Sequence, residues 1–160
     1  MENRLEYLIK QNKRKKELGN CKNQFSKILN TTIQEEDFLN IERTVSLTKK
    51  FYESYKRSKG KICEKHPSSE TEEVEKVIKK ICSKLSTNDG YLITKQTEDC
   101  GLLRVSITNV LLNYAEVINF DQDCLCILTT DEREGIYIDY FEEANNDVFS
   151  WYYELCYWEV

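Results

Sequence analysis

The segment CLCILTTDEREGIYIDYF, residues 124–141, decides the fold class of this 160-residue chain. Residues 124–129 and 136–141 are rich in β-branched and aromatic side chains, and apolar positions alternate in the second run. A period of two is typical of a strand with one buried face. Residues 131–135, DEREG, separate the two runs and form a plausible turn. The segment therefore predicts a strand, a turn and a second strand.

Further strands are predicted on both sides of this pair. Bulky side chains alternate through residues 149–158, FSWYYELCYW, and predict a final strand. Residues 91–94 and 102–107 favour strands by composition. Residues 109–120 fit either a helix or a strand, and their apolar spacing favours the helix. The second half of the chain is thus expected to form a mostly antiparallel sheet.

Helical spacing dominates the first half of the chain. It predicts a helix that stops at Gly19, a second over residues 21–29, and a third from the capping-box segment TIQE, residues 32–35, to Gly60. A second capping-box segment, SETE at residues 69–72, precedes a helix that reaches Leu85. Helices followed by strands are typical of an α+β protein.

A change of composition around the single proline predicts how the chain is organised. Lys59 to Ser69 contains Gly60, Pro67 and two serines, which favour a change of direction. We therefore expect a helical region at 1–60, a linker at 61–70 and an α+β region with the C-terminal sheet at 71–160. A chain of this length has enough residues for one core, so these regions should form one compact unit.

The two halves of the chain carry opposite charge. Residues 1–86 hold 20 Lys and Arg against 13 Asp and Glu, whereas residues 87–160 hold 3 against 15. Such asymmetry is an argument about partners rather than about the fold. The start of the chain has no apolar segment of signal-peptide type, and no run is long enough for a membrane span. We therefore expect a cytoplasmic protein with reduced thiols and no membrane partner.

Motifs for catalysis and for cofactors are weak. His66 is the only histidine, and the five glycines do not form a phosphate-binding loop. Residues 63–66, CEKH, have the spacing of half a zinc site, but a structural zinc usually needs a second closely spaced pair. Packing on a strand explains Cys124 and Cys126 equally well. We therefore predict no enzyme, no cofactor and no metal site.

A basic run, Lys13 to Lys16, raises a nucleic-acid hypothesis. Neighbouring glutamates indicate a solvated helix face instead, and the acidic second half would repel phosphates. Two alternatives stay open. A nucleic-acid-binding regulator would place this run beside Lys56, Arg57, Lys59 and Lys61, and an unrecognised enzyme would have a cleft around Asp121, Asp123 or Asp139.

Acidic and aromatic residues interleave in the C-terminal half, which is the composition of an interface for a cationic partner. Aromatic side chains would anchor the partner and carboxylates would steer it. The predicted partner-binding residues are Asp121, Asp123, Asp131, Glu132, Glu134, Tyr137, Asp139, Glu142, Glu143, Asp147, Tyr152 and Trp158.

In texture, residues 91–160 resemble the immunity proteins of contact-dependent and polymorphic toxin systems. The likeness is carried by strands such as GIYIDYFEE, residues 135–143, and WYYELCYWEV, residues 151–160. The resemblance implies that the partner is a cognate bacterial toxin, often a basic nuclease that acts on tRNA or DNA. It also implies that inhibition comes from covering the active site of the toxin.

Overall fold

The computed structural model describes residues 3–58, 62–122 and 124–160. The helices are α1 (Arg4–Ile28), α2 (Ile41–Arg57), α3 (Thr71–Lys84), α4 (Thr97–Cys100), α5 (Ile107–Leu112) and α6 (Tyr114–Asp121), with a 3-10 turn η1 (Glu35–Asp37). The strands are β1 (Ile62–Pro67), β2 (Asp89–Ile93), β3 (Leu103–Ser106), β4 (Cys124–Thr129), β5 (Glu134–Asn145) and β6 (Val148–Glu159). The predicted α+β class is confirmed.

One antiparallel sheet of order β1-β6-β5-β4-β2-β3 organises the molecule. Its longest unit is the β5–β6 hairpin, which pairs continuously from Glu134 and Glu159 to Asn145 and Val148. The hairpin turn is the two residues Asn146 and Asp147, with φ values of 48° and 64°. Two consecutive positive φ angles are typical of the type I′ turn, which matches the twist of paired strands.

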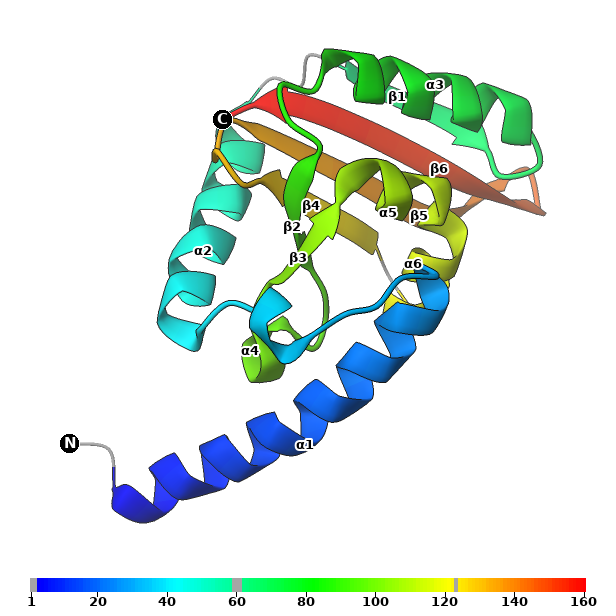
Figure 1. Ribbon diagram of the computed structural model, residues 1–160. Helices are drawn as coiled ribbons and strands as arrows, with labels where there is room; N and C mark the ends of the chain where they lie inside the picture. The colour runs from blue at the N-terminus through cyan, green and yellow to red at the C-terminus, as the bar shows by residue number, and fades with distance from the viewer. Residues whose placement is uncertain (1–2, 59–61, 123) are drawn as a thin grey trace.

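Helices cover both faces of this sheet (Figure 1). The larger core lies between one face and helices α1, α3, α5 and α6, and it includes Phe25, Ile81 and Leu155. Helix α2 covers part of the opposite face, where Phe51 packs in a second cluster with Trp158. Neighbouring residues of a strand point to opposite faces, so those of β4 belong alternately to the two clusters. Strand β4 is therefore buried on both sides.

Helix α1 is continuous, so the predicted stop at Gly19 is wrong. A glycine inside a helix costs only about 1 kcal/mol relative to alanine. Burial of Leu18, Cys21 and Phe25 along one side outweighs that cost. The first half of α1 extends past the rest of the molecule (Figure 1) and exposes Leu5.

The third predicted helix begins later than its capping-box segment suggested. Residues 35–37 form only the 3-10 turn, and Phe38 bridges Leu103 of β3. This bridge keeps the chain extended, so α2 starts after Asn40, whose side-chain oxygen accepts a hydrogen bond from Arg43 N at 2.8 Å. Helix α2 ends at Arg57, and the predicted stop at Gly60 lies outside the described residues.

Most of the segment expected to be a linker, residues 61–70, is the edge strand β1. It pairs with β6 from Ile62 opposite Tyr157 to Pro67 opposite Tyr152. Proline is compatible with an edge strand, because one side of such a strand needs no sheet hydrogen bonds. The same residues that predict a linker therefore also fit a sheet edge. Helix α3 follows as predicted, but its N-cap Glu70 makes no side-chain capping bond.

Residues 109–120 are helical, as the apolar spacing favoured, but Asn113 divides them between α5 and α6. In the part of the chain that the structure describes, no helix has both the length and the apolar character needed to cross a membrane.

Candidate functional site

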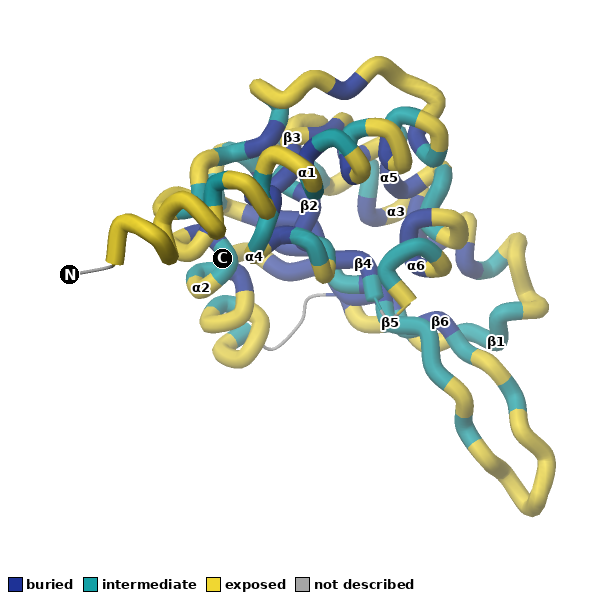
Figure 2. Tube along the Cα trace, turned by 90° about the horizontal axis from the view of Figure 1, so that it is seen from below, coloured by how far each residue is buried: buried dark blue, intermediate teal, exposed yellow. Residues whose placement is uncertain are grey.

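The outer half of the β5–β6 hairpin, residues 140–151, is the most prominent surface feature and is called the outer arm below. Strand β4 pairs with β5 only as far as Asp139, and β1 pairs with β6 only as far as Tyr152. Beyond these positions the two strands continue as a ribbon that projects from the body with an exposed tip (Figure 2). Within the described ranges, one edge of β5 in the outer arm therefore has no neighbouring strand.

Aromatic rings stiffen the base of the outer arm on one face. Tyr140 stacks against both Trp151 and Tyr153, with ring centroids 4.7 Å apart in each case. Tyr114 of α6 meets Tyr153 edge-to-face at 5.2 Å. Burial at this junction raises the pKa of Tyr153 to about 12. This row of rings connects the arm to the core, because such pairs add to the energy of simple burial.

The other face of the arm is held by a cation and two rings. Phe141 and Tyr152 stack with centroids 6.1 Å apart, and Lys65 Nζ of β1 lies 4.8 Å from the centroid of Tyr152. The same ammonium donates to Glu143 Oε2 at 2.6 Å. A two-stranded ribbon alone is marginally stable in water, so these contacts explain how the arm keeps its shape.

The tip and one side of the arm expose apolar side chains to solvent. Val148 is 64% exposed, Phe149 is 66% exposed and Trp151 is 44% exposed. Trp151 and Tyr140 also form one wall of a groove of about 400 Å³ against Ile118 and Asn119 of α6. Several exposed large apolar residues on one element are typical of an interaction site.

The arm is also strongly acidic. From Glu134 to the end of the chain the sequence contains no Lys or Arg. The arm itself carries Glu142, Glu143 and Asp147, and among the described residues only Glu143 of these three has an ion-pair partner. Exposed aromatic residues beside unneutralised carboxylates form a surface suited to a basic protein.

Three of the predicted partner-binding acids lie instead in contacts within the chain. Asp131 accepts a hydrogen bond from Thr129 Oγ1 at 2.7 Å, and this bond holds the pKa of the carboxyl below its usual value. Glu132 pairs with Lys50 and Arg43 of α2. Glu134 is buried and accepts hydrogen bonds from Ser86 N and Tyr157 OH.

Two predicted aromatic anchors are covered by α2. Trp158 is 1% exposed, its indole N–H donates to Ser54 Oγ at 3.0 Å, and its ring lies over Gly135. Tyr137 packs against Tyr55 with centroids 5.1 Å apart. Trp158 therefore cannot touch a partner, because it is enclosed between the sheet and α2.

The remaining predicted residues divide between the arm and its base. Glu142, Glu143, Asp147 and Tyr152 lie on the arm or at its start, and Asp139 is half-buried beside it. Asp121 ends α6 and accepts a hydrogen bond from Lys95 N at 2.7 Å. Asp123 lies outside the described residues.

Sequence reasoning missed Val148 and Phe149 as surface residues. The predicted second strand stopped at Phe141, whereas β5 continues to Asn145. The sequence Asn145-Asn146-Asp147 was the available indication, since Asn and Asp tolerate the positive φ angles of a hairpin turn.

The cysteines are arranged differently from the prediction. Cys63 and Cys156 lie directly opposite each other on β1 and β6 and form a disulfide, whereas reduced thiols were expected. His66 is three residues from Cys63 on the same strand, so it faces the other side of the sheet and the half zinc site does not form. Cys124 and Cys126 share one face, as expected, with their sulfurs 3.7 Å apart.

The described members of the basic set lie in two separate places. Lys13 of α1 pairs with Asp99 at 2.9 Å and borders a pocket beside Ile41, the first residue of α2. Lys56 and Arg57 lie in the last turn of α2, roughly 25 Å away along a helix of this length. Lys59 and Lys61 lie outside the described residues. The geometry expected for a nucleic-acid-binding regulator is therefore absent from the described part of the chain.

Comparisons of the chain with protein-family models, with curated proteins and with solved structures found no match. Function is therefore inferred from the geometry of the chain and from its sequence texture.

Proposed function

We propose that this chain is a binding protein that uses its outer arm to inhibit a basic partner protein. The observation that carries the proposal is the arm itself, a braced two-stranded ribbon with exposed Val148, Phe149 and Trp151 at or near its end. A rigid element that exposes large side chains loses little conformational entropy on binding. Binding through the arm would explain why these apolar side chains are exposed although the core of the chain does not need them.

The negative charge of the outer arm indicates the kind of partner that it would bind. The acids of the arm have no basic neighbours along the chain, and of the arm's acids only Glu143 has an ion-pair partner, Lys65, among the described residues. Carboxylates around an apolar centre favour a partner with Lys and Arg on its surface, because complementary charge accelerates association and rejects acidic proteins. The active site of a nuclease fits this description, since it is basic in order to hold phosphates.

The resemblance to toxin immunity proteins extends the proposal to a cognate bacterial toxin, with a nuclease domain as the expected target. Trp151 and Phe149 would enter the substrate cleft, and Glu142 and Asp147 would pair with cations that otherwise hold tRNA or DNA. Inhibition in this mechanism requires no catalytic residue on the chain.

The experiment tests the basic nuclease domain that the proposal expects to be encoded beside the gene of this protein. Cleavage of tRNA and DNA is measured with increasing amounts of the chain, and binding kinetics are measured at about 0.1 M and 0.5 M salt, where screening differs strongly. We expect inhibition at a one-to-one ratio. Trp151→Ala should weaken binding at least about tenfold through faster dissociation, whereas the double variant Glu142→Gln, Asp147→Asn should mainly slow association.

Leu112→Ala is the matched control, because Leu112 is 74% exposed and lies at the end of α5. This control should bind and inhibit like the unmodified chain. Full nuclease activity in excess chain would refute the toxin assignment. Unchanged inhibition by the Trp151→Ala variant would refute the role of the arm.

A further inference from the structure

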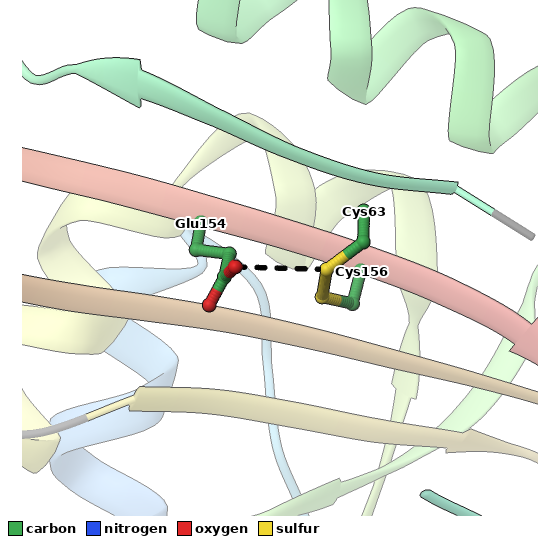
Figure 3. Close-up of side chains that lie close together, drawn as sticks. All are labelled: Cys63, Glu154 and Cys156. Carbon is green, nitrogen blue, oxygen red and sulfur yellow. Dashed lines mark hydrogen bonds between the residues drawn. A yellow bond between two sulfur atoms is a disulfide. The ribbon is translucent and has the colours of Figure 1, made fainter. Parts of the chain in front are cut away.

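Two cysteine sulfurs and a carboxylate from two neighbouring strands meet on the sheet face that α2 partly covers. Cys63 on edge strand β1 lies directly opposite Cys156 on β6, with their Cα atoms 4.2 Å apart. Glu154 lies two residues before Cys156, so strand alternation places it on the same face. Its Oε1 lies 3.8 Å from Cys63 Sγ (Figure 3).

The spacing of these three groups fits the ligands of a single metal ion. One donor atom from each residue lies within 4.8 Å of the other two. Thiolate sulfur and carboxylate oxygen bind Zn²⁺ at about 2.3 Å and 2.0–2.2 Å, which places tetrahedral ligands roughly 3.5–3.8 Å from one another. Small side-chain movements are therefore sufficient to enclose an ion.

The surroundings of the cluster favour a cation that arrives from solvent. Cys63 is exposed, Glu154 is half-buried and Cys156 is buried. Solvent therefore reaches the cluster at Cys63 on β1, whereas Cys156 on β6 is shielded from it. Asp139 lies opposite Glu154 on β5 and adds a second carboxylate to this face. The two carboxylates also act on Tyr55, whose pKa is raised first by burial and then by their charge. Lys65 opposes this negative potential, but its hydrogen bond goes to Glu143.

The other cysteine pairs differ from this one in ways that matter for a metal. Cys21 and Cys100 lie 3.3 Å apart in the core, where burial raises the pKa of both thiols and disfavours the thiolate that binds metals. Cys124 and Cys126 belong to one strand, and among the described residues neither is part of a three-ligand group.

We propose that the reduced form of the chain binds one thiophilic divalent cation, of the Zn²⁺ class, through Cys63, Cys156 and Glu154. A dithiol reductant first gives two electrons and two protons to the Cys63–Cys156 disulfide, which breaks the S–S bond and leaves two thiols while the reductant becomes a disulfide. The cation then displaces both thiol protons, which are released to solvent. The fourth position stays open to water. Disulfide and metal are therefore alternative states of the same cysteine pair.

Co²⁺ is the probe for the test, because its tetrahedral thiolate complexes absorb visible light. The full chain is reduced with dithiothreitol, freed of reductant without air and titrated with Co²⁺, and Zn²⁺ is then added in competition. We expect one equivalent of Co²⁺ with a thiolate-to-metal band that Zn²⁺ removes. Cys63→Ser should abolish the band, and Glu154→Gln should weaken Co²⁺ binding at least about tenfold.

Cys82→Ser is the matched control, since Cys82 is a partly buried free cysteine of α3 outside the cluster. It should bind Co²⁺ like the unmodified chain. Circular dichroism checks that each variant is folded, and substitution of the exposed Cys63 at the sheet edge should leave the fold intact. Co²⁺ binding that survives in Cys63→Ser, or that is lost in Cys124→Ser instead, would overturn the proposal. Absence of any thiolate band in the reduced chain would also overturn it.

Discussion

The inner and outer halves of the β5–β6 hairpin belong to the same two strands but have opposite surroundings. In the inner half, Ile138 pairs with Leu155 and both are fully buried beneath helices. In the outer half, Glu142 pairs with Trp151 and Ala144 pairs with Phe149, and these residues are exposed. Both halves are rich in aromatic residues. The comparison shows that the helices covering a strand, rather than its composition, determine whether its aromatic residues form a core or a surface.

The two tryptophans of β6 give the largest expected difference between the halves. Trp158→Ala should lower the free energy of unfolding by about 3–5 kcal/mol, because it opens a cavity between Gly135 and α2. Trp151→Ala should lower it by no more than about 1 kcal/mol, since this ring is partly solvated already. Urea denaturation measures both values. Equal losses would mean that the outer arm is part of the stabilising core, which would weaken the proposed binding role.

A tyrosine in each half gives a smaller difference. Tyr157 OH donates to buried Glu134 Oε1 at 2.6 Å, and burial together with this carboxylate raises the pKa of Tyr157. Tyr157→Phe should therefore lower the free energy of unfolding by about 1–3 kcal/mol, because the carboxylate loses a partner. Tyr152→Phe, at the start of the outer arm, is the matched control and should change it by less than about 0.5 kcal/mol. Urea denaturation measures this free energy. If Tyr157→Phe left it unchanged, the contacts of Ser86 alone would satisfy Glu134.

The smallest expected effect is on the pH dependence of stability, to which the carboxylate of Glu132 contributes. The pKa of Glu132 is held below its usual value, first by the hydrogen bond from Lys50 and also by Arg43. A lowered folded-state pKa contributes stability above the unfolded-state pKa, and this contribution is lost as the pH falls through the folded-state value. Glu132→Gln should cost within about 1 kcal/mol near neutral pH, and the difference from the unmodified chain should shrink in acid.

Thermal unfolding followed from neutral to acidic pH measures this effect, and Glu142→Gln on the outer arm is the control. A constant difference between the Glu132→Gln variant and the unmodified chain at every pH would contradict the ion-pair explanation. It would instead indicate that the amide disturbs the contact between α2 and the turn before β5.

Local sequence patterns predicted most of the elements. The buried positions of α3 and the bounds of β4 follow from helical and strand periodicity, which depends only on neighbouring residues. The errors occur where a distant contact decides. Gly19 lies within α1 because the helix packs on the core, and residues 62–67 are a strand because β6 offers an unpaired edge. Neither contact is visible in a local window.

The sequence predicted only part of the candidate site, because distant contacts decide which of its residues are exposed. The acidic and aromatic character of the C-terminal half was evident, and Glu142, Glu143 and Asp147 do lie on the outer arm. Trp158 and Glu134 were placed with them because a buried aromatic or acid has the same local sequence as an exposed one. Cys63 and Cys156 are 93 residues apart, so no spacing rule could bring them together.

By itself, the sequence determined the α+β class, the position of the long periodic elements and the opposite charge of the two halves, since these follow from composition and short-range periodicity. Only the tertiary structure decided which half of the β5–β6 hairpin is covered, which acids are satisfied within the chain and which cysteines meet. These outcomes depend on strand register and helix packing, where a shift of one residue moves a side chain to the opposite face.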